Sequence, residues 1–182
     1  MKILETERLI LRTWEKSDIE PYLAFNNDPK VLELLLGPLT REQVETFFEK
    51  SNAGFLKDGY MLFAVEEKTS GELIGYVGLC NVPWDAHFTP AVEIGWRLGS
   101  QYWGKGYATD AAREVLRYAF EELQLDEVVS FTSPLNVRSI RVMEKIGLKR
   151  DRDGDFLWPR VPADHKLSPC VLYRLKRGDY VI

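Results

Sequence analysis

The feature that most constrains the fold is a strand that runs through a glycine turn into a long amphipathic helix. Val92–Leu98 has the alternation of a strand, and Gly104–Ala108 opens the helix. One apolar stripe then follows at helical spacing, made of Ala111, Ala112, Val115, Leu116, Ala119, Phe120 and Leu123. Because such a stripe must be buried against another layer, the segment predicts an α/β or α+β domain.

The turn before this helix has the chemistry of an anion site. Gly104, Gly106 and Ala108 have little or no side chain, so a phosphate can approach the main chain. The first N–H groups of a helix have no partner within it, and the helix dipole adds positive charge there. Lys105 can add a full charge. A tight turn with a purely structural role is the alternative.

Two common nucleotide-binding patterns do not fit this turn. It lacks the GK[ST] ending of a Walker loop and the third glycine of the dinucleotide fingerprint. The helix also follows several strands of a meander, whereas the dinucleotide fingerprint follows the first strand. Both patterns are therefore disfavoured as explanations of Gly104–Ala108.

Periodicity and capping signals predict the remaining elements. Thr40 and Gln43 form a capping box before a helix that reaches about Lys57. Ser17 is expected to cap a shorter helix that runs towards Asn27. The other expected elements are strands at Arg8–Arg12, Met61–Val65, Leu73–Leu79 and Val128–Thr132, a helix at Val137–Ile146 that stops at Gly147, and a hairpin of Leu148–Leu157 and Val171–Lys176.

Composition and charge limit the class of protein. A chain of 182 residues with 45% apolar and 29% charged residues predicts one globular domain, residues 1–182. The net charge of -4 provides no positive field for nucleic acid, and no apolar run is long enough to span a membrane. Cys80 and Cys170 lack the spacing of a disulfide framework or a zinc site, so we expect a cytoplasmic protein without a metal.

Three motifs at compatible spacing resemble those of the GNAT acetyltransferases. Gly106 and Ala108 fall on the small positions of the coenzyme A motif Q/R-x-x-G-x-G/A, with Trp103 where Gln or Arg is usual. The form YWGKGYATDA and the opening ETERLILR are similar to the branch that includes the ribosomal-protein N-terminal acetyltransferases. Asn136 and Ser139 match that branch's N-x-x-S helix. The resemblance covers nearly the whole chain in element order.

The resemblance implies a GNAT fold, with a central twisted mixed sheet of about seven strands flanked by about four helices. Its fourth and fifth strands, here Val92–Leu98 and Val128–Thr132, would splay apart around the pantetheine of acetyl-CoA. The implied coenzyme contacts are Trp96, Arg97, Leu98, Trp103, Gly104, Lys105, Gly106, Tyr107, Ala108, Asn136 and Ser139. Main-chain groups of the fourth strand would polarise the thioester carbonyl, whose oxygen gains charge during acyl transfer.

The implied reaction is acetyl transfer from acetyl-CoA to a primary amine, which is either a protein N-terminus or a small molecule. Since the amine must lose a proton, Glu93 is the candidate base, with an ion pair to Arg97 as its alternative role. Met143 stands where many relatives have a proton-donating tyrosine, so Ser139 is the candidate acid, with capping as its alternative role. A homodimer is usual for the family.

Loop side chains form a second set of candidates, each with a structural role as the alternative. These are His87 and His165, which could titrate near neutral pH, and Trp84 and Trp158, which could line an acceptor pocket.

Other interpretations stay open. Asp151, Asp153 and Asp155 would share one strand face, which either favours a cationic acceptor or forms a solvated acidic edge. A non-catalytic coenzyme A-binding sensor or scaffold is the alternative to an enzyme, and a binder of nucleotide phosphates is a third class.

Overall fold

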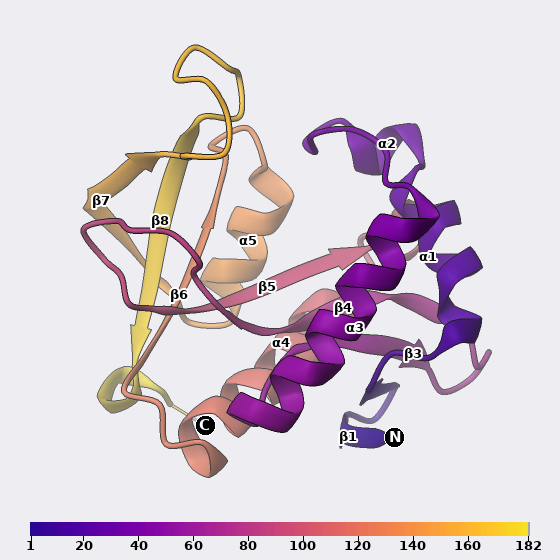
Figure 1. The fold of residues 1–182 in the computed structure, drawn as a ribbon. Coiled ribbons are helices and arrows are strands. Elements are labelled where there is room, and N and C mark those ends of the chain that lie inside the picture. Colours follow the sequence, from indigo (N-terminus) through magenta and orange to yellow (C-terminus); the bar gives the residue numbers. More distant parts are fainter. Residues whose placement is uncertain (182) are drawn as a thin grey trace. The chain divides into compact units, whose positions relative to one another are not determined.

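A computed structural model describes residues 1–181. Its elements (Figure 1) are β1 (Lys2–Glu5), β2 (Leu9–Arg12), α1 (Ile19–Asn26), α2 (Pro29–Leu32), α3 (Arg41–Asp58), β3 (Leu62–Glu67), β4 (Leu73–Asn81), β5 (Val92–Leu98), α4 (Tyr107–Arg117), β6 (Glu127–Thr132), α5 (Val137–Lys145), β7 (Lys149–Leu157) and β8 (Pro169–Lys176). The hydrogen-bonded strand order is β1-β2-β3-β4-β5-β6-β8-β7. The expected mixed α/β class is confirmed, with eight strands and five α-helices in the described chain.

The chain divides into two compact units. Unit 1 consists of Met1–Leu79 and Gly95–Val115, and unit 2 consists of Cys80–Ile94 and the chain from Leu116 onward. The strand β5 therefore begins in unit 2 and ends in unit 1. That residues 1–182 act as one acetyltransferase domain stays a prediction. Within residues 1–181, no helix is both long and apolar enough to cross a membrane.

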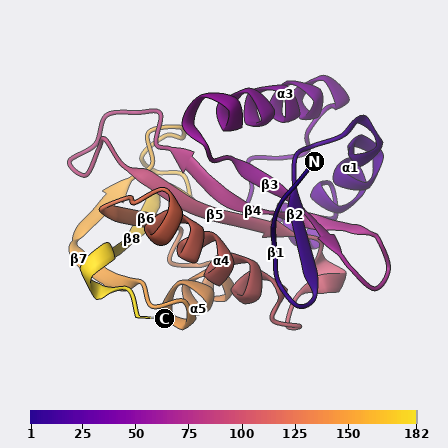
Figure 2. The ribbon, with the colours of Figure 1, turned by 90° about the horizontal axis from the view of Figure 1, so that it is seen from below.

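Unit 1 is an antiparallel meander of β1 to β4 with helices on both faces. Leu9 lies opposite Glu67 between β2 and β3, and β3 pairs with β4 in the same antiparallel sense. The helix α3 lies across one face of these strands, and the start of α4 lies across the other (Figure 2). Aromatic rings fill the core under α3: Trp14 stacks on Phe48 with centroids 4.1 Å apart, and Tyr22 meets Phe48 edge-on at 5.5 Å. This packing fixes α1 and α3 on the strands.

The helix α3 begins and ends where its sequence predicts. The Thr40 hydroxyl accepts the Gln43 N–H at 3.3 Å, and the Gln43 side chain accepts the Thr40 N–H at 2.8 Å. At the other end, Gly59 has φ +78°, a left-handed conformation that glycine adopts without strain. The capping box is therefore confirmed.

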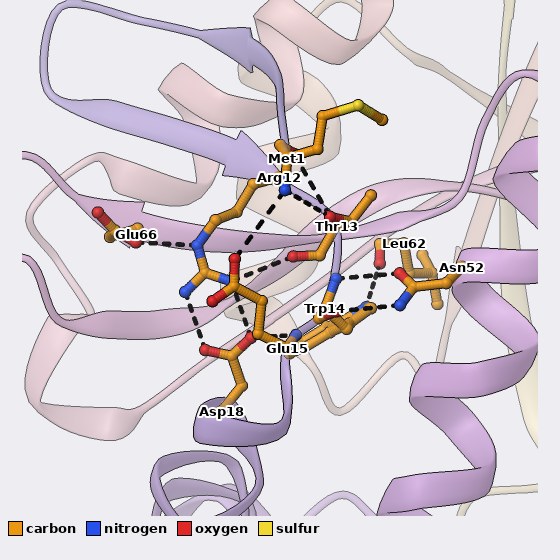
Figure 3. A network of polar contacts seen from close by, with 9 residues as sticks. All are labelled: Met1, Arg12, Thr13, Trp14, Glu15, Asp18, Asn52, Leu62 and Glu66. Atoms are coloured by element: carbon orange, nitrogen blue, oxygen red, sulfur yellow. Dashed lines mark hydrogen bonds and ion pairs between the residues drawn. The ribbon is translucent and has the colours of Figure 1, made fainter.

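Arg12 joins β2, β3 and the turn before α1 in unit 1 (Figure 3). Its guanidinium donates to both carboxylate oxygens of Asp18 at 2.8 Å and to Glu66 at 2.8 Å. The hydrogen bonds that Arg12 donates to Asp18 and Glu66 hold its pKa above the ordinary value, although burial opposes them. The side chains of Arg12 and Asp18 are only 12% and 4% exposed, so water screens their attraction little.

We expect Arg12→Met to lower the free energy of unfolding by about 3 kcal/mol, because it leaves the buried Asp18 carboxylate without its counter-ion. Urea unfolding measures this loss. The control is Lys2→Met, since the side chains of Lys2 and its partner Glu5 are 54% and 49% exposed and such pairs contribute little. A loss at Arg12 no larger than that at Lys2 would contradict the expectation.

Unit 2 is built on β6, β8 and β7, with the start of β5 beside β6. β6 pairs antiparallel with β8, and β8 pairs antiparallel with β7. β5 pairs with β6 in parallel at Glu93 opposite Val129, and the Ser130 hydroxyl donates to the Ile94 carbonyl at 2.8 Å. A parallel ladder limited to the start of β5 agrees with the splayed strands that the resemblance implied.

Short elements account for the differences from the sequence prediction. The strand β1 and the four-residue helix α2 were not expected. Ser17 is not a helix cap: it lies inside a 3-10 turn, Lys16–Asp18, and Asp18 is the N-cap residue of α1. This difference from the prediction is due to a tertiary contact, because Arg12 binds the Asp18 carboxylate at the start of α1. After α4 the chain continues through one π-helical turn, Tyr118–Glu122.

Candidate active site

The glycine turn of unit 1 has the backbone conformation that its residues allow. Gly104 and Gly106 have φ +75° and +84°, and both are exposed. A Cβ atom at Gly106 would lie 3.3 Å from the Arg8 guanidinium, whereas one at Gly104 would meet nothing within 4 Å. Trp103, at the position where Gln or Arg is usual, donates its indole N–H to the Leu98 carbonyl at 2.9 Å. Trp103 therefore fixes the exit from β5.

Six consecutive main-chain N–H groups at the start of α4 have no hydrogen-bond partner within residues 1–181, those of Gly104 to Thr109. The first bond of the helix runs from the Asp110 N–H to the Gly106 carbonyl at 3.0 Å. The Trp103 N–H, by contrast, donates to the Ser100 carbonyl at 3.2 Å. Unpaired N–H groups at a helix N-terminus, together with its dipole, can bind a phosphate.

Arg8 supports this turn and was not singled out from the sequence. Its guanidinium donates to the Lys105 carbonyl at 3.0 Å and to the Asp110 carboxylate at 2.6 and 2.9 Å. It also lies 4.6 Å from the centre of the Tyr107 ring, whose hydroxyl bonds to Glu67. Arg8 thus holds a carbonyl of the turn away from the unpaired N–H groups. No local pattern could reveal a contact between residues 102 positions apart.

We expect Arg8→Lys to raise the KM for acetyl-CoA about five- to tenfold and to leave kcat nearly unchanged. Lys lacks the planar fork that bonds Lys105 and Asp110 together, so the turn loses its orientation. Steady-state kinetics with acetyl-CoA varied provides the measurement. A fall in kcat with an unaltered KM would show that Arg8 does not position the turn.

Glu93 in unit 2 is a carboxyl group with a raised pKa and a thiol donor beside it. It accepts a hydrogen bond from the Cys80 thiol at 3.8 Å. Burial raises the pKa of Glu93 to about 8, against the opposing effects of Cys80 and of the Arg160 guanidinium. Burial also raises the pKa of Cys80 well above its usual value, so the thiol stays protonated as a donor. Arg160 lies 5.0 Å from the centre of the Trp84 ring.

Arg97 of unit 1 does not serve as the partner of Glu93 that the sequence offered. Its guanidinium donates to the side-chain oxygen of Asn26 at 2.6 Å. The neighbouring Leu98 is buried and Trp96 is half-buried. The main chain of Trp96, Arg97 and Leu98 as a coenzyme contact stays a prediction.

The start of α5 in unit 2 has the expected capping geometry. Asn136 is the N-cap residue: its oxygen accepts the Ser139 N–H at 3.2 Å, and its side-chain amide donates to Thr132 at 3.2 Å. The Ser139 hydroxyl is half-buried and has no hydrogen-bond partner within residues 1–181. Met143 is 1% exposed and packs in the core. Ser139 therefore keeps a hydroxyl available for donation.

The loop candidates have mainly structural partners. His165 accepts the Leu167 N–H at 3.2 Å through Nδ1, and exposed His87 packs edge-on against Phe88. The indole N–H groups of Trp84 and Trp158 are buried without a partner among residues 1–181. No three or more His, Cys, Asp or Glu side chains of the described chain are grouped to hold a metal ion.

Two of the three aspartates of β7 are neutralised within unit 2. Asp151 accepts from Arg174 at 2.6 Å, and Asp155 accepts from Arg150 at 2.6 Å. The pairing with β8 is irregular between Asp151 and Phe156. An acidic face for a cationic acceptor is therefore not formed by these residues.

The strand order and the unpaired N–H groups define a mixed α/β protein that can bind an anionic group at a helix N-terminus. Residues 8–149 match the family model described as "Acetyltransferase (GNAT) domain". The chain therefore belongs to the GNAT acetyltransferase family.

Relatives agree with this assignment. The chain is 31% identical over 149 residues to the "Uncharacterized N-acetyltransferase YnaD" of Bacillus subtilis, across 81% of this chain and 83% of the relative. It is 33% identical over 154 residues to the FsC-acetyl coenzyme A-N(2)-transacetylase of Aspergillus fumigatus, across 80% of this chain and 64% of the relative. The ribosomal-protein-S5-alanine acetyltransferase of Vibrio fischeri has a TM-score of 0.78 at 18% identity over 100% of both chains, a likeness of fold alone.

Proposed function

We propose that the chain transfers the acetyl group of acetyl-CoA to a primary amine by direct attack of the amine on the thioester. The observation that carries this proposal is the row of unpaired N–H groups from Gly104 to Thr109 beside exposed glycines. Acetyl-CoA has a diphosphate that such a row would bind. The family resemblance favours a protein or peptide N-terminus as the acceptor.

In this proposal Glu93 is the general base. The amine nitrogen attacks the thioester carbon, the C–S bond breaks, and the amine proton passes to Glu93, directly or through one water. A pKa of about 8 makes Glu93 a stronger base than an ordinary carboxylate while leaving part of it ionised at neutral pH. The main chain of Trp96 to Leu98 would hold pantetheine and stabilise the charge on the carbonyl oxygen.

Ser139 is the proposed donor of a proton to the departing thiolate. Its hydroxyl has no other partner within residues 1–181, and Met143 has no proton to give. Asn136 would bind the coenzyme through the amide N–H that Thr132 does not use. If Ser139→Ala lowers kcat less than about tenfold, solvent supplies this proton and Ser139 has no such role.

A non-catalytic coenzyme A-binding sensor is the second candidate, and it would bind the same diphosphate. The pKa of Glu93 favours the enzyme, because a sensor has no need of a carboxyl group held near neutrality. A thiol-release assay with acetyl-CoA, N-terminal peptides and small amines separates the two. Turnover with any acceptor supports the enzyme; stabilisation by coenzyme A without turnover would support the sensor, and stabilisation by ATP or NAD instead would contradict both.

A further inference from the structure

Arg97 of β5 places a positive charge in the aromatic core of unit 1. Its guanidinium donates to Asn26, which is 0% exposed, and lies 5.6 Å from the centre of the Tyr76 ring. The Tyr22 hydroxyl also faces it, and burial raises the pKa of Tyr22 so that this group stays neutral. Arg97 as a whole residue is half-buried, so part of its side chain meets solvent.

Among the described residues this charge has no counter-ion. Arg97 forms no ion pair within residues 1–181. The carboxylates of the neighbouring segment are used elsewhere: Asp18 binds Arg12, and Asp28 binds Ser100 and the Lys30 N–H. A partly buried cation that has only neutral partners costs free energy, which an anionic ligand would offset.

The donor geometry indicates the kind of anion. A guanidinium has five N–H donors. Asn26 accepts from one of them and the Tyr22 hydroxyl also bonds to the group, so three remain, enough to present two parallel N–H groups. Two parallel donors match the two oxygens of a carboxylate. The unpaired N–H groups at the start of α4 already provide a separate place for the diphosphate.

We propose that the acceptor amine of this enzyme carries a carboxylate, and that Arg97 binds this carboxylate in unit 1. The proposal rests on the proposed acetyl transfer and makes Arg97 a determinant of acceptor specificity. The carboxylate belongs either to a free amino acid or to an acidic side chain near a peptide N-terminus.

Matched acceptor pairs test the proposal. The first pair is leucine and leucinamide, and the second is the C-terminally amidated peptides Ala-Glu-Ala and Ala-Gln-Ala. The wild type is expected to prefer the carboxylate member of one pair by about tenfold or more in kcat/KM. The pair that shows the preference identifies the source of the carboxylate. Equal rates within both pairs would overturn the proposal while leaving acetyl transfer intact.

Two variants and one control make the assignment to Arg97 specific. Arg97→Gln should abolish the preference by raising the KM of the carboxylate member to that of its neutral counterpart. Asn26→Asp should abolish it as well, because it supplies a permanent counter-ion beside Arg97 and retains the charge. Arg152→Gln, which alters an exposed arginine of β7, should keep the preference.

The failures are distinguishable. If Arg97→Gln slows both members of a pair alike, or raises the KM of acetyl-CoA instead, the carboxylate subsite is wrong. If no acceptor is turned over, the proposed function fails. Calorimetry that measures binding of leucine and of the Ala-Glu-Ala peptide then tests the carboxylate subsite independently of turnover. Binding to the wild type that is lost in both variants would support it, and no binding would overturn it. Circular dichroism checks that each variant is folded.

Discussion

Glu93→Gln is expected to lower kcat for acetyl transfer by about 100-fold or more, with little effect on the KM for acetyl-CoA. A general base contributes about 100- to 10,000-fold to a rate, and Gln is isosteric but cannot take a proton. Asp153→Asn, which neutralises an exposed carboxylate of β7, is the matched control and should keep the wild-type rate. A kcat within about tenfold of the wild type would remove Glu93 from the mechanism.

The pH dependence follows from the same group. The base form of Glu93 predominates only above its pKa of about 8, so kcat/KM should rise with pH and level off above that value. The acceptor amine can titrate in the same range. The pH profile of kcat/KM is therefore measured with two acceptors of different amine pKa. An inflection caused by Glu93 stays at the same pH for both acceptors, whereas one caused by the amine shifts with the pKa of the amine.

Glu93 also links stability to pH. The pKa of Glu93 is raised in the folded protein from 4.5 to about 8, so the folded state binds the proton more tightly. The protonated Glu93 therefore contributes to the free energy of unfolding, fully below about pH 4.5, and this contribution is lost as pH rises through 8. It amounts to at most roughly 5 kcal/mol. Partial exposure of the side chain makes the measured loss smaller. Glu93→Gln should thus melt higher than the wild type at pH 9 and differ less at pH 5.

Gly106→Val is expected to weaken acetyl-CoA binding by about 100-fold. The φ of +84° is strained for a β-branched residue, and a Cβ at this position approaches Arg8 at 3.3 Å. If the main chain moves to relieve the strained φ or the approach to Arg8, the N–H groups of Gly104 to Thr109 turn away from the diphosphate. Calorimetric titration with acetyl-CoA measures the loss.

Gly37→Val is the matched control for this change. Gly37 also has a positive φ, +116°, but a Cβ there meets nothing within 4 Å. It carries a comparable backbone cost at a position before α3, so it should destabilise the fold without altering the Kd for acetyl-CoA. Equal Kd changes in the two variants would indicate a general loss of structure and contradict a local role for Gly106.

Local signals predicted the elements with strong sequence patterns. The capping box of Thr40 and Gln43 set the start of α3, and two-residue alternation gave β3 and β4. The mixed sheet and the helix after the glycine turn were likewise expected. Short elements escaped prediction, because four residues such as β1 or α2 carry too little periodicity.

The supporting contacts of the candidate site could not be predicted. Arg8 meets Asp110 across 102 positions, and Cys80 reaches Glu93 from the neighbouring strand β4. The local pattern predicts Ser17 as the helix cap, but the structure has Asp18 at this position. Asp18 is held there by Arg12, a tertiary contact that local propensity does not reveal. Sequence patterns therefore predicted the main-chain segments of the candidate site. The side chains that orient the turn or adjoin Glu93 come from distant parts of the chain and are known only from the tertiary structure.

The most direct test of the account is an NMR titration that follows the backbone amides of Gly104 to Thr109. Pantetheine, which lacks the diphosphate, serves as the matched control for coenzyme A. We expect coenzyme A to shift these six amides strongly and pantetheine to leave them nearly unchanged. If saturating coenzyme A shifts other amides and leaves these six in place, the diphosphate does not bind at the start of α4 and the account is contradicted.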